Sequence, residues 1–171
     1  LVGLDMDPTT EKLLFLGFFF ALAVKAPPWP FHTWLPDAAA EAKPGTSVLL
    51  IGVLDKVGTF GMIRYCLPIF PAASEFYAPV VIGMALIGIF YGAIASYGQT
   101  DLKRVIAFSS VGHMGFVLLG ISTLSAVGIN AALFGNIAHG IITGLLFFVV
   151  GGIKTRTGTT RFADLPRGLY A

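Results

Sequence analysis

Charged residues, cysteines and nucleotide-binding motifs are all scarce in this sequence of 171 residues. Charged residues make up 12% of the chain, against about 25% in soluble domains. Together with a hydrophobic content of 56%, this scarcity excludes an ordinary soluble domain and a disordered chain. A formal net charge of +2 is too small for a surface that follows nucleic-acid phosphates, so we expect no nucleic-acid partner.

Signals for cofactors are also missing from the sequence. The single cysteine, Cys66, excludes a disulfide scaffold and an iron–sulfur cluster held by this chain alone. There is no Gly-x-Gly-x-x-Gly, Walker A or Cys-x-x-Cys motif, and the three histidines lack the spacing of metal ligands. We therefore expect no metal site and no redox cofactor in this chain.

Long apolar runs are what the sequence contains instead, and its mean hydropathy is +0.83. A helix that crosses a membrane needs about 20 mostly apolar residues. The runs lack the period-two alternation of barrel strands. The sequence therefore predicts an all-α, polytopic transmembrane helix bundle in a lipid bilayer with about five crossings, at Leu13–Glu41, Thr46–Leu67, Pro79–Tyr97, Val105–Leu124 and Val127–Ile153.

The two ends of the sequence do not look like the ends of a whole protein. Residue 1 is Leu, and Asp5, Asp7 and Glu11 lie where a signal peptide would be basic. The last residues, Arg167–Ala171, carry no evident end signal. We interpret residues 1–171 as a fragment of a single membrane domain that is cut in loops at both ends.

The first crossing is predicted to be discontinuous near Ala26–Pro30. Leu13–Ala26 is about 21 Å long at 1.5 Å per residue, which is too short for an apolar core of about 30 Å. Prolines at 27, 28 and 30 then interrupt the helix. Such broken helices mark ion sites in transporters. The alternative is a helix that ends at Ala26, followed by an interfacial loop with Trp29 and Trp34 as an aromatic belt.

The lysines and arginines outside the crossings are divided unequally between the two sides of the predicted bundle. One side carries two, Lys12 and Arg64, whereas the other carries seven: Lys43, Lys103, Arg104, Lys154, Arg156, Arg161 and Arg167. The positive-inside rule predicts that the C-terminus of the chain is cytoplasmic. Asp101, Lys103 and Arg104 are interpreted as interface anchors at the start of a helix.

Lys56 lies near the middle of the second crossing. A charge at that depth is costly and is normally kept for function, and an amine there can alternate between charged and neutral forms. Gly52, four residues earlier on the same helix face, leaves room for a neighbouring helix. The alternative is a structural ion pair with Asp55, although adjacent residues do not face each other on a helix.

His113 and His139 are central in the fourth and fifth crossings. Each heads a short polar stripe, with Ser109 and Ser110 before His113 and with Asn136 before His139. Histidine titrates near neutral pH and suits a proton relay, but it can also be a hydrogen-bonded packing residue. Because Lys56 is predicted at a similar depth, we favour a relay within the membrane.

Three further titratable residues lie around the predicted break. Lys25 precedes the prolines and either reaches towards the interface from a helix end or lies at the midplane of the membrane. His32 and Asp37 follow the break, and turn or capping roles are favoured over proton uptake for both.

The motifs resemble the antiporter-like membrane subunits of respiratory complex I, and among them the M-subunit (mitochondrial subunit 4) family. The segments that carry the resemblance are Val24–Ala38, Ser47–Arg64, Gln99–Arg104, Ser110–Phe116, Ile137–Gly140 and Arg156–Thr159. The resemblance implies a proton-translocating subunit of fourteen helices with inverted repeats, of which this chain would hold helices seven to eleven. It also implies that Lys25, Lys56, His113 and His139 transfer protons. Asp55, His32 and Asp37 are secondary candidates.

The resemblance places electron transfer in other subunits, with NADH, flavin, iron–sulfur clusters and quinone. It implies neighbouring antiporter-like subunits as partners and a bacterial inner membrane as the location. Two positions depart from the family pattern: Ala39 stands where histidine is usual, and Asp55 stands where an apolar residue is usual. Two other functions stay open, namely a subunit of a related cation/proton antiporter or membrane-bound hydrogenase, and a scaffold that conducts nothing.

Overall fold

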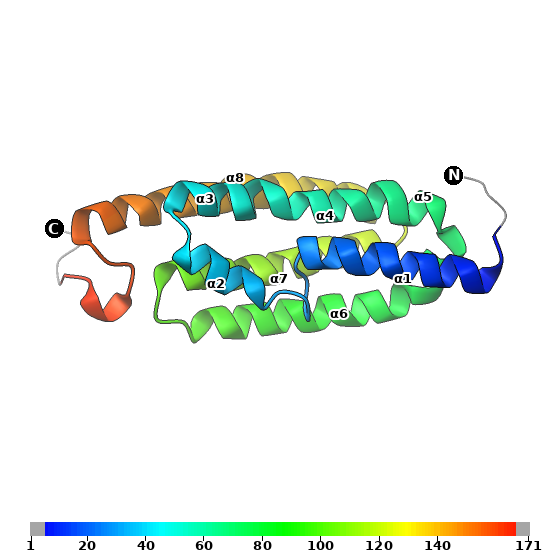
Figure 1. The fold of residues 1–171 in the computed structure, drawn as a ribbon, viewed down its shortest axis with the longest axis horizontal. Helices are drawn as coiled ribbons and strands as arrows, with labels where there is room; N and C mark the ends of the chain where they lie inside the picture. Colours follow the sequence, from blue (N-terminus) through cyan, green and yellow to red (C-terminus); the bar gives the residue numbers. More distant parts are fainter. Residues whose placement is uncertain (1–5, 167–171) are drawn as a thin grey trace.

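The computed structural model describes residues 6–166, which fold into helices that run along one common axis (Figure 1). An isolated bridge between Asp101 and Arg161 is the one β-type pairing among these residues. The all-α fold class is therefore confirmed.

The first crossing is divided into two helices, as predicted. Helix α1 (Pro8–Lys25) is followed by turns, and helix α2 (Trp34–Glu41) then continues towards the same end of the bundle (Figure 1). The start of α1 differs from the expected Leu13. The Asp7 carboxylate accepts hydrogen bonds from the backbone N–H groups of Thr9 and Thr10, so the helix begins earlier and is about 27 Å long.

Trp34 closes the gap between the two half-helices. Its indole Nε1 donates a hydrogen bond to the Val24 carbonyl oxygen, 3.1 Å away, in the last turn of α1. That carbonyl has no partner within its own helix, because the chain leaves the helix after Lys25. The indole N–H of Trp34 therefore links the two half-helices. The alternative, in which Trp34 belongs to an aromatic belt at the membrane interface, did not predict this hydrogen bond.

The second crossing is one helical rod with two wide turns. It consists of α3 (Pro44–Leu49), the π-helical segment η1 (Leu50–Leu54), α4 (Asp55–Gly61), a second π-helical segment η2 (Met62–Cys66) and α5 (Leu67–Ile69). π-Helical turns are rare and are found frequently at functional sites. Both flank α4, which carries Lys56.

Three further long helices complete the bundle: α6 (Pro71–Tyr97), α7 (Leu102–Ser122) and α8 (Ala126–Thr157). Helix α6 begins before the expected Pro79, and a short 3₁₀ turn, η3 (Phe162–Asp164), follows α8. By length and hydropathy, four helices in the described residues can cross a membrane: 44–69, α6, α7 and α8. With the divided α1–α2 crossing, this agrees with about five crossings.

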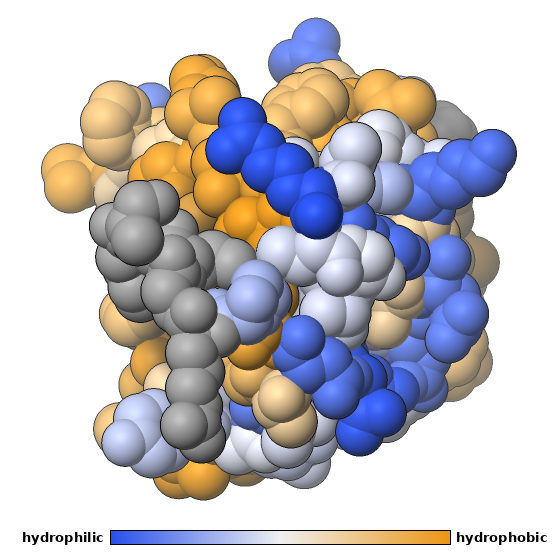
Figure 2. Space-filling model, turned by 90° about the vertical axis from the view of Figure 1, so that its left-hand side faces the viewer, coloured by the Kyte–Doolittle hydropathy of each residue, from blue (hydrophilic) through white to orange (hydrophobic). Residues whose placement is uncertain are grey.

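Hydrophilic residues mark one end of the bundle. Helix α8 ends at the same end of the molecule as the α2–α3 and α6–α7 turns (Figure 1), and hydrophilic residues gather there (Figure 2).

Lys103 differs from its expected role as an interface anchor, since its side chain is only 1% exposed. Its ammonium donates to the Ala40 and Ala42 carbonyl oxygens, at 2.8 and 2.5 Å, and so caps the end of α2.

Candidate proton-transfer site

Lys56 and His139 are in direct contact across the interface between α4 and α8. The Lys56 Nζ atom lies 2.7 Å from His139 Nδ1 and 2.7 Å from the Ile51 carbonyl oxygen. An ammonium group has only donors, so His139 Nδ1 accepts when Lys56 is charged. Ile51 belongs to the π-helical segment η1, and its carbonyl orients the amine towards α8.

His113 lies next to His139 on the other side of the contact. The two imidazole rings are 5.3 Å apart between centroids and are tilted by 31°. His113 Nδ1 donates to the Ser109 carbonyl oxygen at 2.8 Å, which leaves its Nε2 free to accept a proton. The structure thus brings together three of the four predicted proton-transfer residues, Lys56, His139 and His113.

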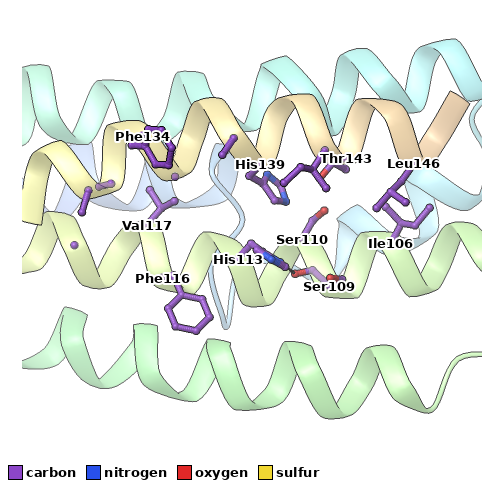
Figure 3. Close-up of a pocket in the computed structure, with 16 residues that line it drawn as sticks. Ile106, Ser109, Ser110, His113, Phe116, Val117, Phe134, His139, Thr143 and Leu146 are labelled. Atoms are coloured by element: carbon purple, nitrogen blue, oxygen red, sulfur yellow. Dashed lines mark hydrogen bonds between the residues drawn. The ribbon is translucent and has the colours of Figure 1, made fainter.

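A cavity of about 410 Å³ opens between α7 and α8 beside the two histidines. Figure 3 shows His139 of α8 and Ser110 of α7 pointing towards one another across it. His139 Nε2 and Ser110 Oγ are buried, and neither has a hydrogen-bond partner among the described residues. Buried polar atoms of this kind are normally satisfied by another polar group or by ordered water.

A second hollow, of about 490 Å³, lies on a different face of α8 and is lined by Lys56 and Gly140. The Lys56–His139 contact therefore lies between two hollows: the amine lines one and the imidazole lines the other. A single contact between two titratable side chains thus connects the two hollows.

The close approach of α8 to the second crossing depends on Gly52 and Gly140. A Cβ atom built on Gly140 would lie 2.7 Å from the Gly52 carbonyl oxygen, closer than an ordinary contact. The expectation that a neighbouring helix approaches at Gly52 is therefore confirmed. A buried hydrogen bond of 2.9 Å from Asn136 Nδ2 to Thr59 Oγ1 joins the same two helices one turn away.

Two further predicted residues, Asp55 and Lys25, make no hydrogen bond to this cluster within residues 6–166. The Asp55 carboxylate is 1% exposed, and its Oδ2 atom is 4.0 Å from Lys56 Nζ. This is the outer limit of an ion pair, as expected for adjacent residues on a helix. Half-buried Lys25 ends α1 directly before Ala26, whose backbone nitrogen packs closely against Gly58 of α4.

His32 and Asp37 lie apart from this cluster. His32 is buried in the turn between α1 and α2 and stacks edge-on against Tyr91 and Phe108, with ring centroids 4.8 and 6.4 Å away. Asp37 forms an exposed ion pair with Arg104 at the start of α7. Neither side chain caps a helix: the N-cap of α2 is Thr33, without a side-chain hydrogen bond, and both ring nitrogens of His32 are buried without a partner among the described residues.

Two parts of the site could not be read from residue types. The Ile51 carbonyl becomes a partner of Lys56 through π-helical geometry, which has no clear sequence signature. Thr59 bridges the Lys56 carbonyl oxygen and Asn136, and its spacing of three residues from Lys56 is the one signal that could have found it. No group of three or more His, Cys, Asp or Glu side chains in the range 6–166 is placed to hold a metal ion.

The chain is similar to known membrane subunits over almost its whole length. The family described as NADH:quinone oxidoreductase/Mrp antiporter, transmembrane, matches residues 5–171. NADH-quinone oxidoreductase subunit M of Mycobacterium tuberculosis is 48% identical over 92% of this chain and 29% of its own length. Subunit M of Escherichia coli K12 is 46% identical over 100% of this chain and 33% of its own length.

Solved structures share the fold as well. A chain of respiratory complex I from Thermus thermophilus with bound NADH superposes with a TM-score of 0.86 at 31% identity, over 92% of this chain and 34% of that chain. A chain of the archaeal membrane-bound sulfane sulfur reductase superposes with a TM-score of 0.83 at 27% identity, over 92% and 33%.

These similarities define the class of protein: a helical, antiporter-like membrane subunit. The chain belongs to the family of NADH:quinone oxidoreductase and Mrp antiporter transmembrane subunits, which confirms the resemblance carried by its motifs. It spans about a third of the length of the curated relatives it matches.

Proposed function

We propose that this chain is part of a proton-translocating membrane subunit of an NADH–quinone oxidoreductase, and that Lys56, His139 and His113 pass protons within the membrane. The observation that carries the proposal is the 2.7 Å contact between Lys56 Nζ and His139 Nδ1, between two hollows. Proton exchange between side chains requires hydrogen-bond distance or one bridging water, and this contact meets the first condition.

In the proposed cycle, one proton passes from Lys56 through His139 to the α7–α8 cavity. A proton leaves the Lys56 ammonium for His139 Nδ1, which makes the amine neutral and the imidazole charged. His139 then releases a proton from Nε2 into the α7–α8 cavity, where His113 Nε2 and Ser110 Oγ are potential acceptors. The imidazole is then neutral with its proton on Nδ1, and a ring flip or a water-mediated exchange must return that proton to Nε2 before Nδ1 can accept again. The amine takes up the next proton from the hollow on its own side.

Electron transfer belongs to partner subunits in this proposal. NADH, flavin, iron–sulfur clusters and quinone would be bound there, and neighbouring antiporter-like subunits would contact the exposed apolar faces of this one. A bacterial inner membrane is the proposed location, and the seven-to-two division of Lys and Arg favours a cytoplasmic C-terminus. Cysteine labelling at an introduced Arg161→Cys tests this orientation, since labelling from the outside alone would reverse it.

Two other functions fit less well. A non-conducting scaffold would bury its titratable residues in apolar packing, whereas His113 and His139 line a cavity here. The fold alone does not separate the oxidoreductase from a related antiporter assembly. A chain of the Mrp complex from Dietzia superposes with a TM-score of 0.79 at 24% identity, over 90% of this chain and 34% of that chain. Co-purification of the whole complex with flavin and iron–sulfur subunits favours the oxidoreductase, and their absence would favour the antiporter.

The direct test is Lys56→Met in the full subunit, assayed as proton translocation in vesicles that contain the assembled complex. Methionine keeps the length of the side chain but cannot carry a proton, so we expect translocation to fall sharply. Lys12→Met is the matched control, because Lys12 lies over the Phe76 ring, far from the site at the start of α1, and should leave translocation unchanged. Full translocation by Lys56→Met at equal assembly would reject the proposal.

A further inference from the structure

Asp55 is a buried carboxyl group without a hydrogen-bond partner. Its side chain is 1% exposed, and neither carboxylate oxygen accepts a hydrogen bond from any described residue. An ionised carboxylate in such a place is strongly disfavoured unless it is paired, whereas a protonated one is tolerated more easily. The Asp55 carboxyl group is thus buried where its protonated form is favoured unless a cation pairs with the ionised form.

The nearest cation does not fully neutralise Asp55. Lys56 Nζ is 4.0 Å from Asp55 Oδ2, too far for a hydrogen bond, and the amine is already engaged with Ile51 and His139 at 2.7 Å. A small rotation of either side chain, or one bridging water, would bring the carboxyl and the amine into proton-transfer range.

The helix break also comes close to the helix that carries Asp55. Gly58, one turn after Asp55 on the same helix face, meets the end of α1 so closely that a Cβ atom there would lie 2.5 Å from the Ala26 nitrogen. The backbones of α1 and α4 are therefore in contact beside Asp55 (Figure 1). Lys25, the last residue of α1, directly precedes Ala26 at this contact.

We propose that Asp55 is a further proton-exchange residue, which links Lys25 at the helix break to Lys56. A proton leaves the Lys25 ammonium and binds the Asp55 carboxylate, giving a neutral amine and a neutral acid. The acid then passes the proton to a neutral Lys56 amine, which restores the carboxylate and the ammonium. The inference rests on the proposed function, and it extends the predicted relay across the second crossing to the end of α1.

The experiment compares three variants of the full subunit in the assembled complex. Asp55→Asn keeps the shape of the side chain but cannot exchange a proton, so we expect proton translocation to fall about tenfold or more, because a placed proton-transfer group typically contributes on the order of 10² or more. Asp55→Glu keeps a titrating carboxyl group and should retain more translocation than Asp55→Asn. Glu11→Gln is the matched control, since Glu11 is also buried but accepts from the Ala73 N–H at 3.1 Å, away from the lysines.

A spectroscopic readout separates proton exchange from a fixed charge. Difference infrared spectra during turnover should show a carboxylic-acid carbonyl band that disappears in Asp55→Asn and persists in Glu11→Gln. Full translocation by Asp55→Asn, or a carboxylate that stays ionised throughout turnover, would overturn the inference. If Lys56→Met abolishes translocation while Asp55→Asn does not, this inference fails and the proposed function stands; if Lys56→Met translocates fully, the proposed function fails.

Discussion

The contact between Gly52 and Gly140 sets the separation of Lys56 and His139, and Gly140→Ala tests this dependence. The added Cβ atom would lie 2.7 Å from the Gly52 carbonyl oxygen, whereas ordinary contacts begin at 3.4 Å. Because both partners of this contact belong to helices, the two helices must separate by about 0.7 Å to relieve the overlap.

This separation is enough to break the transfer contact. If the shift is passed on to the side chains, the distance from Lys56 Nζ to His139 Nδ1 rises from 2.7 Å to about 3.4 Å, beyond the range of a hydrogen bond. Overpacking of this kind also costs about 1–3 kcal/mol of stability. We therefore expect Gly140→Ala to assemble with a lowered thermal stability and to translocate protons several-fold more slowly.

Gly144→Ala is the matched control, one turn further along the same helix. A Cβ atom on Gly144 would lie 3.6 Å from Val48 Cγ1, which is an ordinary contact. This variant should keep both the stability and the proton translocation of the parent complex, measured side by side in vesicles. If Gly140→Ala translocates as fast as Gly144→Ala, the helix separation does not control the site and the reasoning is wrong.

Two further predictions concern the end of the bundle that carries the α2–α3 turn. Lys103→Met removes the cap from the Ala40 and Ala42 carbonyls and should lower the free energy of unfolding by about 1–3 kcal/mol, measured as a lower thermal inactivation temperature. Lys154→Met is the control, because the Lys154 side chain is exposed. Equal inactivation temperatures for the two variants would contradict the capping role. Asp37→Asn breaks an ion pair that is exposed on both sides and should cost less than about 1 kcal/mol in the same assay, so a loss as large as that of Lys103→Met would refute this estimate.

The features that follow from residue type and spacing could be predicted from the sequence. Three prolines after a short apolar run were sufficient to locate the break between α1 and α2, because proline removes backbone donors wherever it occurs. The convergence of Lys56, His113 and His139 followed from their central positions in three apolar runs, since polar groups in a membrane avoid lipid.

The features that depend on tertiary contacts could not be predicted in the same way. Lys103 was interpreted as an interface anchor because helix-end lysines usually reach water, but the α2 carbonyls packed against it offer stronger partners. The π-helical turns around α4 change which carbonyl meets Lys56, and they arise from packing rather than from a local residue pattern. The depth of Asp55 was clear from the sequence, whereas its lack of a partner was not.

The central claim is that Lys56 acts by exchanging a proton, and it is tested most directly by comparing Lys56→Arg with Lys56→His. Arginine keeps a positive charge but does not release its proton at physiological pH, whereas imidazole titrates near neutrality. Proton translocation in vesicles, at equal assembly of the complex, should be low for Lys56→Arg and higher for Lys56→His. Full translocation by Lys56→Arg together with a loss in Lys56→His would contradict the claim and would assign Lys56 the role of a fixed charge.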